Sequence, residues 1–186
     1  EASACMELAE RFSFFSFKSE ERNFIRGDYG SLRKQNYPVL DPSYLLKSVD
    51  DENMTTDQLE KMLEGIPMQW TWATSLTENE QVLIPFSWFY AINEFNGPSA
   101  GNTIEEAALQ GISEIVERHV CSKINRFQIK TPLIDQKSIT DPVACELLEK
   151  FNKNNIELYL NDFSLDTGIC TVGALAIDRS TFPELS

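Results

Sequence analysis

This chain of 186 residues has little histidine and little cysteine. His119 is its one histidine, so neither a Ser/His/Asp nor a Cys/His catalytic arrangement can be argued from the sequence. The four cysteines, Cys5, Cys121, Cys145 and Cys170, lie far apart and form no C-x-x-C pair. This spacing argues against a zinc site and a disulfide framework, and favours reduced thiols.

Positive charge is also scarce. Lysine and arginine together number 16 against 29 aspartates and glutamates, which gives a net charge of −13. Because nucleic acids are bound chiefly through lysine and arginine, this balance argues against a nucleic-acid partner. No run reaches the roughly 18 apolar residues of a membrane span, and no signal segment is evident. We therefore expect a cytoplasmic protein with no membrane association.

The chain contains enough apolar residues for a packed core. Hydrophobic residues make up 42% of the chain and aromatic residues 11%, which argues against disorder. The length favours one domain over residues 1–186.

Two segments carry the same acidic pattern, Glu-x-x-Glu-Arg. The first opens the chain as SACMELAER, and the second follows a Gly/Asn turn as NTIEEAALQGISEIVERHV. The polar residues of the two segments are Ser3, Glu7, Glu10 and Arg11 in the first, and Asn102, Glu106, Glu114, Glu117 and Arg118 in the second.

A helical period of about 100° per residue places these carboxylates on one face of each helix. The opposite faces are apolar and are expected to be buried: Cys5, Leu8, Ala9 and Phe12 in the first helix, and Ile104, Ala108, Leu109, Ile112, Ile115, Val116 and Val120 in the second. Two like charges about 4 Å apart repel by about 4 kcal/mol at an effective dielectric of about 20. If the two acidic faces converge, a hard cation such as Mg²⁺ with nucleotide phosphate would relieve that repulsion.

A simpler interpretation stays open for each segment alone. Glu7 with Arg11, and Glu114 with Arg118, are i,i+4 pairs that stabilise a solvated helix by about 0.2–0.5 kcal/mol. Thr103-x-x-Glu106 is also a capping box, which gives Glu106 a structural role. The repetition and the Gly/Asn turn favour a functional role, because free N–H groups at a helix N-terminus bind phosphate readily.

Together the two segments resemble the glutamate-rich motifs of the YcaO family, Ser-x-x-x-Glu-x-x-Glu-Arg and a Gly/Asn turn followed by Glu-x7-Glu-x-x-Glu-Arg. The resemblance implies ATP-dependent phosphorylation of a peptide-backbone amide oxygen, followed by addition of a nucleophile in a cyclodehydration, thioamidation or related reaction. It implies that Mg²⁺ and nucleotide phosphate lie among the motif glutamates, Glu7, Glu10, Glu106, Glu114 and Glu117. Ser3, Arg11, Asn102 and Arg118 would then lie beside the ATP.

The resemblance also bears on completeness and on partners. Glu1 lies within the first motif's helix, so we expect a fragment or excised domain that is inactive alone. Where the family often has an acidic residue after the second Glu-Arg, this chain has His119, for which an exposed helix surface is the simpler expectation. The implied partners are a peptide or protein substrate and a substrate-delivery protein; a homodimer is also open.

The rest of the chain predicts an α+β fold, a mostly antiparallel sheet with packed helices and with both Glu-x-x-Glu-Arg helices facing one site. We expect helices over 2–17, 43–47, 55–64, 103–127 and 141–154, and strands over 68–73, 82–86, 156–163 and 170–178. Residues 18–36 read as a polar segment with turns, and Asp50-Asp51-Glu52 as a solvated acidic loop.

Two other functions fit the same residues. One is a non-catalytic binding or scaffold protein with an incomplete nucleotide site. The other is an acidic structural module whose two acidic faces point away from each other.

Overall fold

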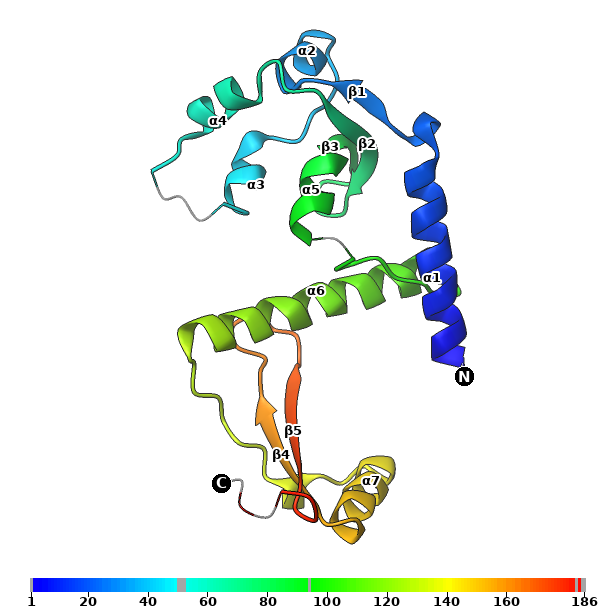
Figure 1. The fold of residues 1–186 in the computed structure, drawn as a ribbon, viewed down its shortest axis with the longest axis vertical. Helices are drawn as coiled ribbons and strands as arrows, with labels where there is room; N and C mark the ends of the chain where they lie inside the picture. Colours follow the sequence, from blue (N-terminus) through cyan, green and yellow to red (C-terminus); the bar gives the residue numbers. More distant parts are fainter. Residues whose placement is uncertain (1, 50–52, 94, 183, 185–186) are drawn as a thin grey trace. The chain divides into compact units, whose positions relative to one another are not determined.

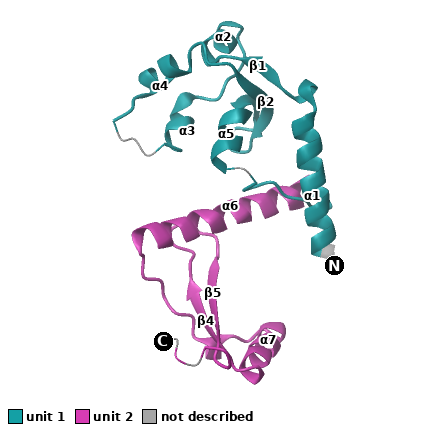
Figure 2. Cartoon of the chain, viewed as in Figure 1, with its two compact units in different colours: residues 1–102 teal, residues 103–186 magenta. Residues whose placement is uncertain are grey.

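The computed structural model describes residues 2–49, 53–93, 95–182 and 184. These form two compact units, residues 1–102 and 103–186 (Figure 2). The acidic run Asp50-Asp51-Glu52 lies outside the described residues. A compact unit is not by itself an independent domain, so the single-domain organisation stays a prediction.

The first unit is a three-stranded sheet with helices around it (Figure 1). It begins with the long helix α1 (Ala2–Ser19) and a short 3-10 turn, η1 (Glu21–Asn23). The sheet has the order β1-β2-β3 and is antiparallel throughout. Its strands and remaining helices are β1 (Ile25–Gly27), α2 (Tyr29–Lys34), α3 (Pro42–Leu46), α4 (Thr56–Leu63), β2 (Met68–Ser75), β3 (Glu80–Pro85) and α5 (Phe86–Asn93).

The core of this unit is built around Trp70, which is fully buried in β2. Its indole N–H donates to the carbonyl of Gly27 at 2.9 Å, so the buried ring leaves no polar atom unsatisfied. The other buried apolar residues come from three helices and β3: Tyr29, Leu32, Leu45, Leu59, Leu63 and Leu83. Burial of these side chains against one face of β2 and β3 fixes the sheet to α2, α3 and α4.

Local signals place the helix ends where the sequence predicts them. Thr55 and Gln58 form a capping box at the start of α4, within the predicted helix over 55–64. Gly65, just past the end of α4, adopts φ +71°, a left-handed conformation that is favourable for glycine. Asp41 and Asp141 cap the starts of α3 and of α7 (Pro142–Lys153), and each precedes a proline at the first helical position.

The second unit consists of the long helix α6 (Ile104–Phe127), a 3-10 turn η2 (Gln136–Ser138), α7, and the antiparallel pair β4 (Ile156–Asp162) and β5 (Val172–Asp178). The β4–β5 register pairs Ile156 with Asp178 at one end and Asp162 with Val172 at the other. α7 packs on β4.

The α+β prediction is confirmed, and the sheet is two small antiparallel sheets. Two helices were not expected. α2 lies within residues 18–36, which read as polar turns, because the carboxylate of Asp28 accepts from the backbone N–H of Ser31 and caps a helix there. α5 begins directly after Pro85, where the aromatic run Phe86–Tyr90 has high strand propensity but packs as a helix against β2. Within the described residues, no helix has the length and hydropathy needed to cross a membrane.

Candidate functional site

The first acidic motif forms a compact ionic cluster on α1. The guanidinium of Arg11 lies 3.8 Å from a carboxylate oxygen of Glu7 and 3.6 Å from one of Glu10. The two carboxylates differ in exposure, since the Glu7 side chain is 68% exposed and that of Glu10 only 16%. The predicted i,i+4 pair of Glu7 with Arg11 is therefore present, and Glu10 adds a second, more buried carboxylate.

Arg11 is held from its other side by an aromatic ring. Its guanidinium carbon lies 4.7 Å from the centroid of Phe95, a cation–π distance. The Nη1 atom is buried and makes no hydrogen bond to any described residue, because the Glu10 oxygen at 3.6 Å is too far to accept one. A buried guanidinium N–H without an acceptor is suited to an anionic oxygen such as that of a phosphate.

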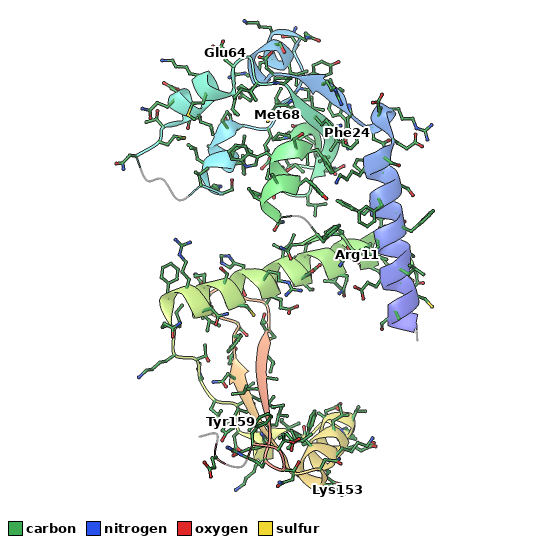
Figure 3. The ribbon with its side chains drawn as sticks, in the orientation of Figure 1. Arg11, Phe24, Glu64, Met68, Lys153 and Tyr159 are labelled. Carbon is green, nitrogen blue, oxygen red and sulfur yellow. The ribbon has the colours of Figure 1, made fainter. Side chains whose placement is uncertain are left out.

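The face of α1 that packs on the first unit is the motif face. Phe14, one turn beyond Glu10 and Arg11, contacts the rings of Phe86, Tyr90 and Phe95 at centroid distances of 5.7–6.3 Å. Phe17 continues this face against Phe24 and Phe86, and Lys18 lies over Tyr90. Figure 3 marks Arg11 and Phe24 on this part of the unit.

The predicted burial of the opposite face is therefore wrong in this structure. Leu8 is 71% exposed and Phe12 73% exposed. Cys5 and Ala9 are exposed as well. The physical reason is that Phe14 and Phe17 bury more aromatic surface against α5 than the Leu8 face can find in the first unit. Helical periodicity identified an apolar stripe but not which stripe packs.

The second acidic motif lies on α6. Thr103 caps this helix as predicted, because its hydroxyl accepts from the backbone N–H of Glu106 at 3.2 Å. The carboxylate of Glu105 accepts hydrogen bonds from its own backbone N–H and from the Thr103 hydroxyl, which lower its pKa. More than two turns further along α6, Arg118 lies 3.6 Å from a carboxylate oxygen of Glu114, which forms the predicted i,i+4 pair.

The apolar face of α6 is also partly exposed to solvent. Ile104, Leu109, Ile112 and Ile115 are 40–85% exposed, so their predicted burial is wrong. Val120 is fully buried, as predicted, and Ala108 and Val116 are half-buried. The reason is that the main packing within the second unit is between α7 and β4 and between β4 and β5, and not on α6.

The remaining predicted site residues are on or beside these helices. Ser3 is exposed on α1, Glu117 is exposed on α6, and Asn102 is exposed just before the Thr103 cap. His119 is exposed on α6, as expected. Phe95 was not identified from the sequence as a site residue. Its position as an aromatic residue directly before the Gly/Asn turn was the one available sign.

The five predicted metal ligands are divided between the two units. Glu7 and Glu10 belong to the first unit, and Glu106, Glu114 and Glu117 to the second (Figure 2). Among the described residues, no three histidine, cysteine, aspartate or glutamate side chains form a group that could hold a metal ion. A site shared by the two helices therefore stays a prediction.

Similarity to known proteins extends over nearly the whole chain. An uncharacterized protein of Methanothermobacter thermautotrophicus is 31% identical over 95% of this chain and 45% of its own length. The ribosomal protein S12 methylthiotransferase accessory factor YcaO of Escherichia coli is 33% identical over 50% of this chain and 16% of its own length. The chain thus spans less than half the length of these curated relatives.

Two solved structures share the fold. A heterocyclase in complex with substrate and cofactor matches 94% of this chain and 26% of its own, with a TM-score of 0.68 and 22% identity. The heterocyclase TruD matches 84% of this chain, also over 26% of its own, with a TM-score of 0.56 and 20% identity. At these identities the likeness is one of fold. A family model described as an ATP- and Mg²⁺-binding YcaO cyclodehydratase matches residues 1–185, and the chain belongs to the YcaO family.

Proposed function

We propose that this chain carries the nucleotide-binding motifs of an ATP- and Mg²⁺-dependent enzyme that activates a peptide-backbone amide by phosphorylating its oxygen. The observation that carries the proposal is the α1 cluster. Two carboxylates, Glu7 and Glu10, flank Arg11, whose buried Nη1 has no hydrogen-bond acceptor among the described residues. Membership of an ATP- and Mg²⁺-binding family supports the same reading.

The donor chemistry of the motif residues fits the proposed ligands. Carboxylate oxygens are hard ligands of the type that Mg²⁺ prefers, and Mg²⁺ is commonly held by one or two of them together with phosphate oxygens. Glu7 and Glu10 on α1, and Glu106, Glu114 and Glu117 on α6, would hold the cation. When bound, Mg²⁺ would neutralise charge on the transferred phosphoryl group.

The arginines would act on the same charge. Arg11 would donate through Nη1 to a phosphate oxygen, while Phe95 and Glu7 fix the plane of its guanidinium. Arg118 would have the corresponding role on α6, where it is already oriented by Glu114. Ser3 and Asn102 would lie beside the nucleotide. In this arrangement catalysis is positioning and electrostatic stabilisation, with a peptide or protein as the substrate and a delivery protein as a further partner.

Titration calorimetry on the whole protein tests this function. ATP with Mg²⁺ is expected to give saturable heat, and ATP alone or Mg²⁺ alone much less, because repulsion among the glutamates must be relieved by the cation. Equal binding of ATP with and without Mg²⁺ would argue against glutamate-held metal. Absence of any binding would reject the nucleotide site.

A non-catalytic binding or scaffold protein is the second candidate. It is favoured by the exposure of motif side chains that also form ordinary i,i+4 ion pairs, since the side chain of Glu7 is 68% exposed and that of Arg118 is 59% exposed. Calorimetry separates the two, because a scaffold with an incomplete site gives no heat that requires both ATP and Mg²⁺.

A further inference from the structure

A groove of about 670 Å³ lies beside the β2–β3 hairpin of the first unit, away from the α1 cluster. Apolar residues of its lining come from the segment before α3, from α3, from the hairpin and from α5, and include Val39, Tyr44, Ala73, Val82, Ile84 and Phe89. The register pairs Ala73 with Val82 and Thr71 with Ile84, so Ala73, Val82 and Ile84 share the hairpin face opposite the buried Leu83. The groove is therefore a partly open sheet face, bordered by one edge of the sheet.

That edge is the outer side of β3, and it is only partly paired. The backbone N–H of Leu83 donates to the carbonyl of Pro38 at 2.8 Å, and the carbonyl of Leu83 accepts from Leu40 at 2.9 Å. These two bonds form a single parallel bridge. The next outward-facing residue along β3 is Gln81, because alternate residues of a strand direct their N–H and C=O to the same side.

Proline ends the pairing at this point. In a continued parallel ladder the carbonyl of Gln81 would accept from the backbone N–H of residue 38, but Pro38 has none. The backbone N–H of Tyr37 instead donates to Leu32, which turns the chain away from β3. Gln81 is thus left at the sheet edge with a donor and an acceptor that face outward, beside an apolar groove.

The rim of the groove is acidic. Asp41, Glu78 and Glu80 line it, and no lysine or arginine is among its lining residues. The whole chain carries a net charge of −13. A second copy placed edge to edge on β3 would therefore set acidic rims against each other, which is unfavourable, whereas a basic segment would be attracted.

We propose that this groove binds an extended basic segment of a separate polypeptide, which adds to the outer edge of β3 at Gln81. Because Glu80 shares the hairpin face of Val82 and Ile84, the side chains of the segment that face the groove are apolar in the middle and basic at the ends. Its apolar side chains lie against Ala73, Val82 and Ile84, and its lysines or arginines lie near Asp41, Glu78 and Glu80. Main-chain bonds to Gln81 provide the register, as in other strand-addition complexes. This inference goes beyond the proposed function and does not require nucleotide.

Fluorescence anisotropy on the whole protein without ATP tests the proposal. The probe is the peptide Lys-Ser-Val-Ser-Val-Ser-Lys with a neutral dye, whose lysine and valine side chains all lie on one face of an extended strand. Saturable binding that weakens as salt is raised is expected. The matched peptide with glutamate in place of lysine is expected to bind at least tenfold more weakly. Equal binding of the two peptides would overturn the charge argument.

Two N-methylated forms of the probe test strand addition directly. One carries methyl groups on the valine amides and the other on the serine amides. Only one set of alternate N–H groups can face β3, so one form is expected to lose at least tenfold in affinity and the other to keep it. Equal affinities for both forms would overturn strand addition at β3.

Variants locate the site. Glu78→Lys with Glu80→Lys is expected to weaken binding at least tenfold. The control with the same charge change, Glu21→Lys with Glu64→Lys, alters exposed residues outside the groove and is expected to change binding less than twofold. If the two double variants weaken binding equally, the peptide is attracted only by the net charge of the protein, and the groove is not its site. Pairing of Gln81 with another segment of the same polypeptide, or dimer formation through β3, would also overturn the proposal.

Discussion

The guanidinium of Arg11 lies 4.7 Å from the ring centroid of Phe95, although 84 positions separate the two residues (95 − 11). Arg11 is on the first acidic motif, and Phe95 directly precedes the Gly/Asn turn that leads to the second. The contact therefore links the α1 cluster to the segment that introduces α6. Because the ring lies over a guanidinium with a buried, unbonded Nη1, Phe95 is a positioning residue for the proposed phosphate contact.

Replacing Phe95 with leucine tests that relationship. A cation–π contact near a surface is worth about 0.5–1 kcal/mol, so we expect the affinity for ATP with Mg²⁺ to fall by about two- to fivefold. Phe127→Leu is the control, since Phe127 also has an arginine over its ring, Arg126 at 5.9 Å, but is 65% exposed and outside both motifs. Titration calorimetry measures both. Unchanged affinity in Phe95→Leu would remove the positioning role.

The carboxylate of Glu10 is the more buried of the two on α1, and its isosteric replacement tests the metal assignment. We expect Glu10→Gln to reduce ATP turnover by the whole protein by tenfold or more, which corresponds to about 1.4 kcal/mol or more, because an amide is a weaker Mg²⁺ ligand and does not balance Arg11. Glu117→Gln is expected to act in the same direction. A steady-state phosphate-release assay at several Mg²⁺ concentrations gives the measurement.

The matched control is Glu149→Gln on α7. Like Glu10, Glu149 is a helix carboxylate in an ion pair, here with Lys153 at 3.4 Å, but it is exposed and is not part of either motif. Its replacement is expected to leave turnover within twofold of the unmodified protein. If Glu10→Gln and Glu149→Gln behave alike, Glu10 is a surface ion-pair residue and the acidic-module interpretation is favoured.

Trp70 and Trp72 lie on the same strand, but Trp70 is buried and Trp72 is partly exposed. Replacing each in turn therefore tests how much burial contributes to stability. Trp70→Phe leaves the carbonyl of Gly27 without its donor and opens space in the core, so we expect the free energy of unfolding to fall by about 1–3 kcal/mol. Trp72 is 47% exposed, and Trp72→Phe is expected to cost less than about 1 kcal/mol. Urea denaturation measures both. Equal losses would mean that the Gly27 hydrogen bond and the burial of Trp70 do not control the stability of this unit.

Local features of the fold were predictable because their causes lie within a few residues. Thr55 with Gln58 determines the start of α4, and Gly65 its end. Thr103 marks the start of α6 in the same way. The alternation of Trp70 and Trp72 with Thr71 identified β2, since strand side chains alternate between faces. The two ion pairs of the motifs, Glu7–Arg11 and Glu114–Arg118, also follow from i,i+4 spacing alone.

Features that depend on tertiary packing were not predictable. The choice of Phe14 and Phe17 over Leu8 and Phe12 as the packing face of α1 depends on where Phe86 and Tyr90 lie. Phe95 entered the site for the same reason, as no local pattern connects it with Arg11. Whether the two acidic helices converge also depends on long-range packing, because α1 and α6 belong to different units.

A pH-dependent network lies in the second unit, where Glu157 on β4 accepts from the hydroxyl of Tyr159 at 2.7 Å and from Arg179 at 2.6 Å. The hydrogen bond from Tyr159, followed by that from Arg179, lowers the pKa of Glu157 below 4.5. The same bond to Glu157 raises the pKa of Tyr159 above 10.0. In the folded state these hydrogen bonds therefore favour the ionised carboxylate of Glu157 and the protonated hydroxyl of Tyr159.

The contributions of Glu157 and Tyr159 to the free energy of unfolding change with pH in opposite directions. For Glu157 the contribution to stability is present above about pH 4.5 and is lost as pH falls through the lowered folded pKa. For Tyr159 it is present below about pH 10 and is lost as pH rises through the raised folded pKa. We expect Tyr159→Phe to raise the pKa of Glu157 towards 4.5, as measured by NMR titration of its side-chain carboxyl carbon. The carboxyl of Asp162, whose pKa is lowered by hydrogen bonds from Ser164 and not by this network, serves as internal reference and is expected to keep its lowered pKa in both proteins. An unchanged Glu157 pKa in Tyr159→Phe would mean that the hydroxyl does not stabilise the carboxylate.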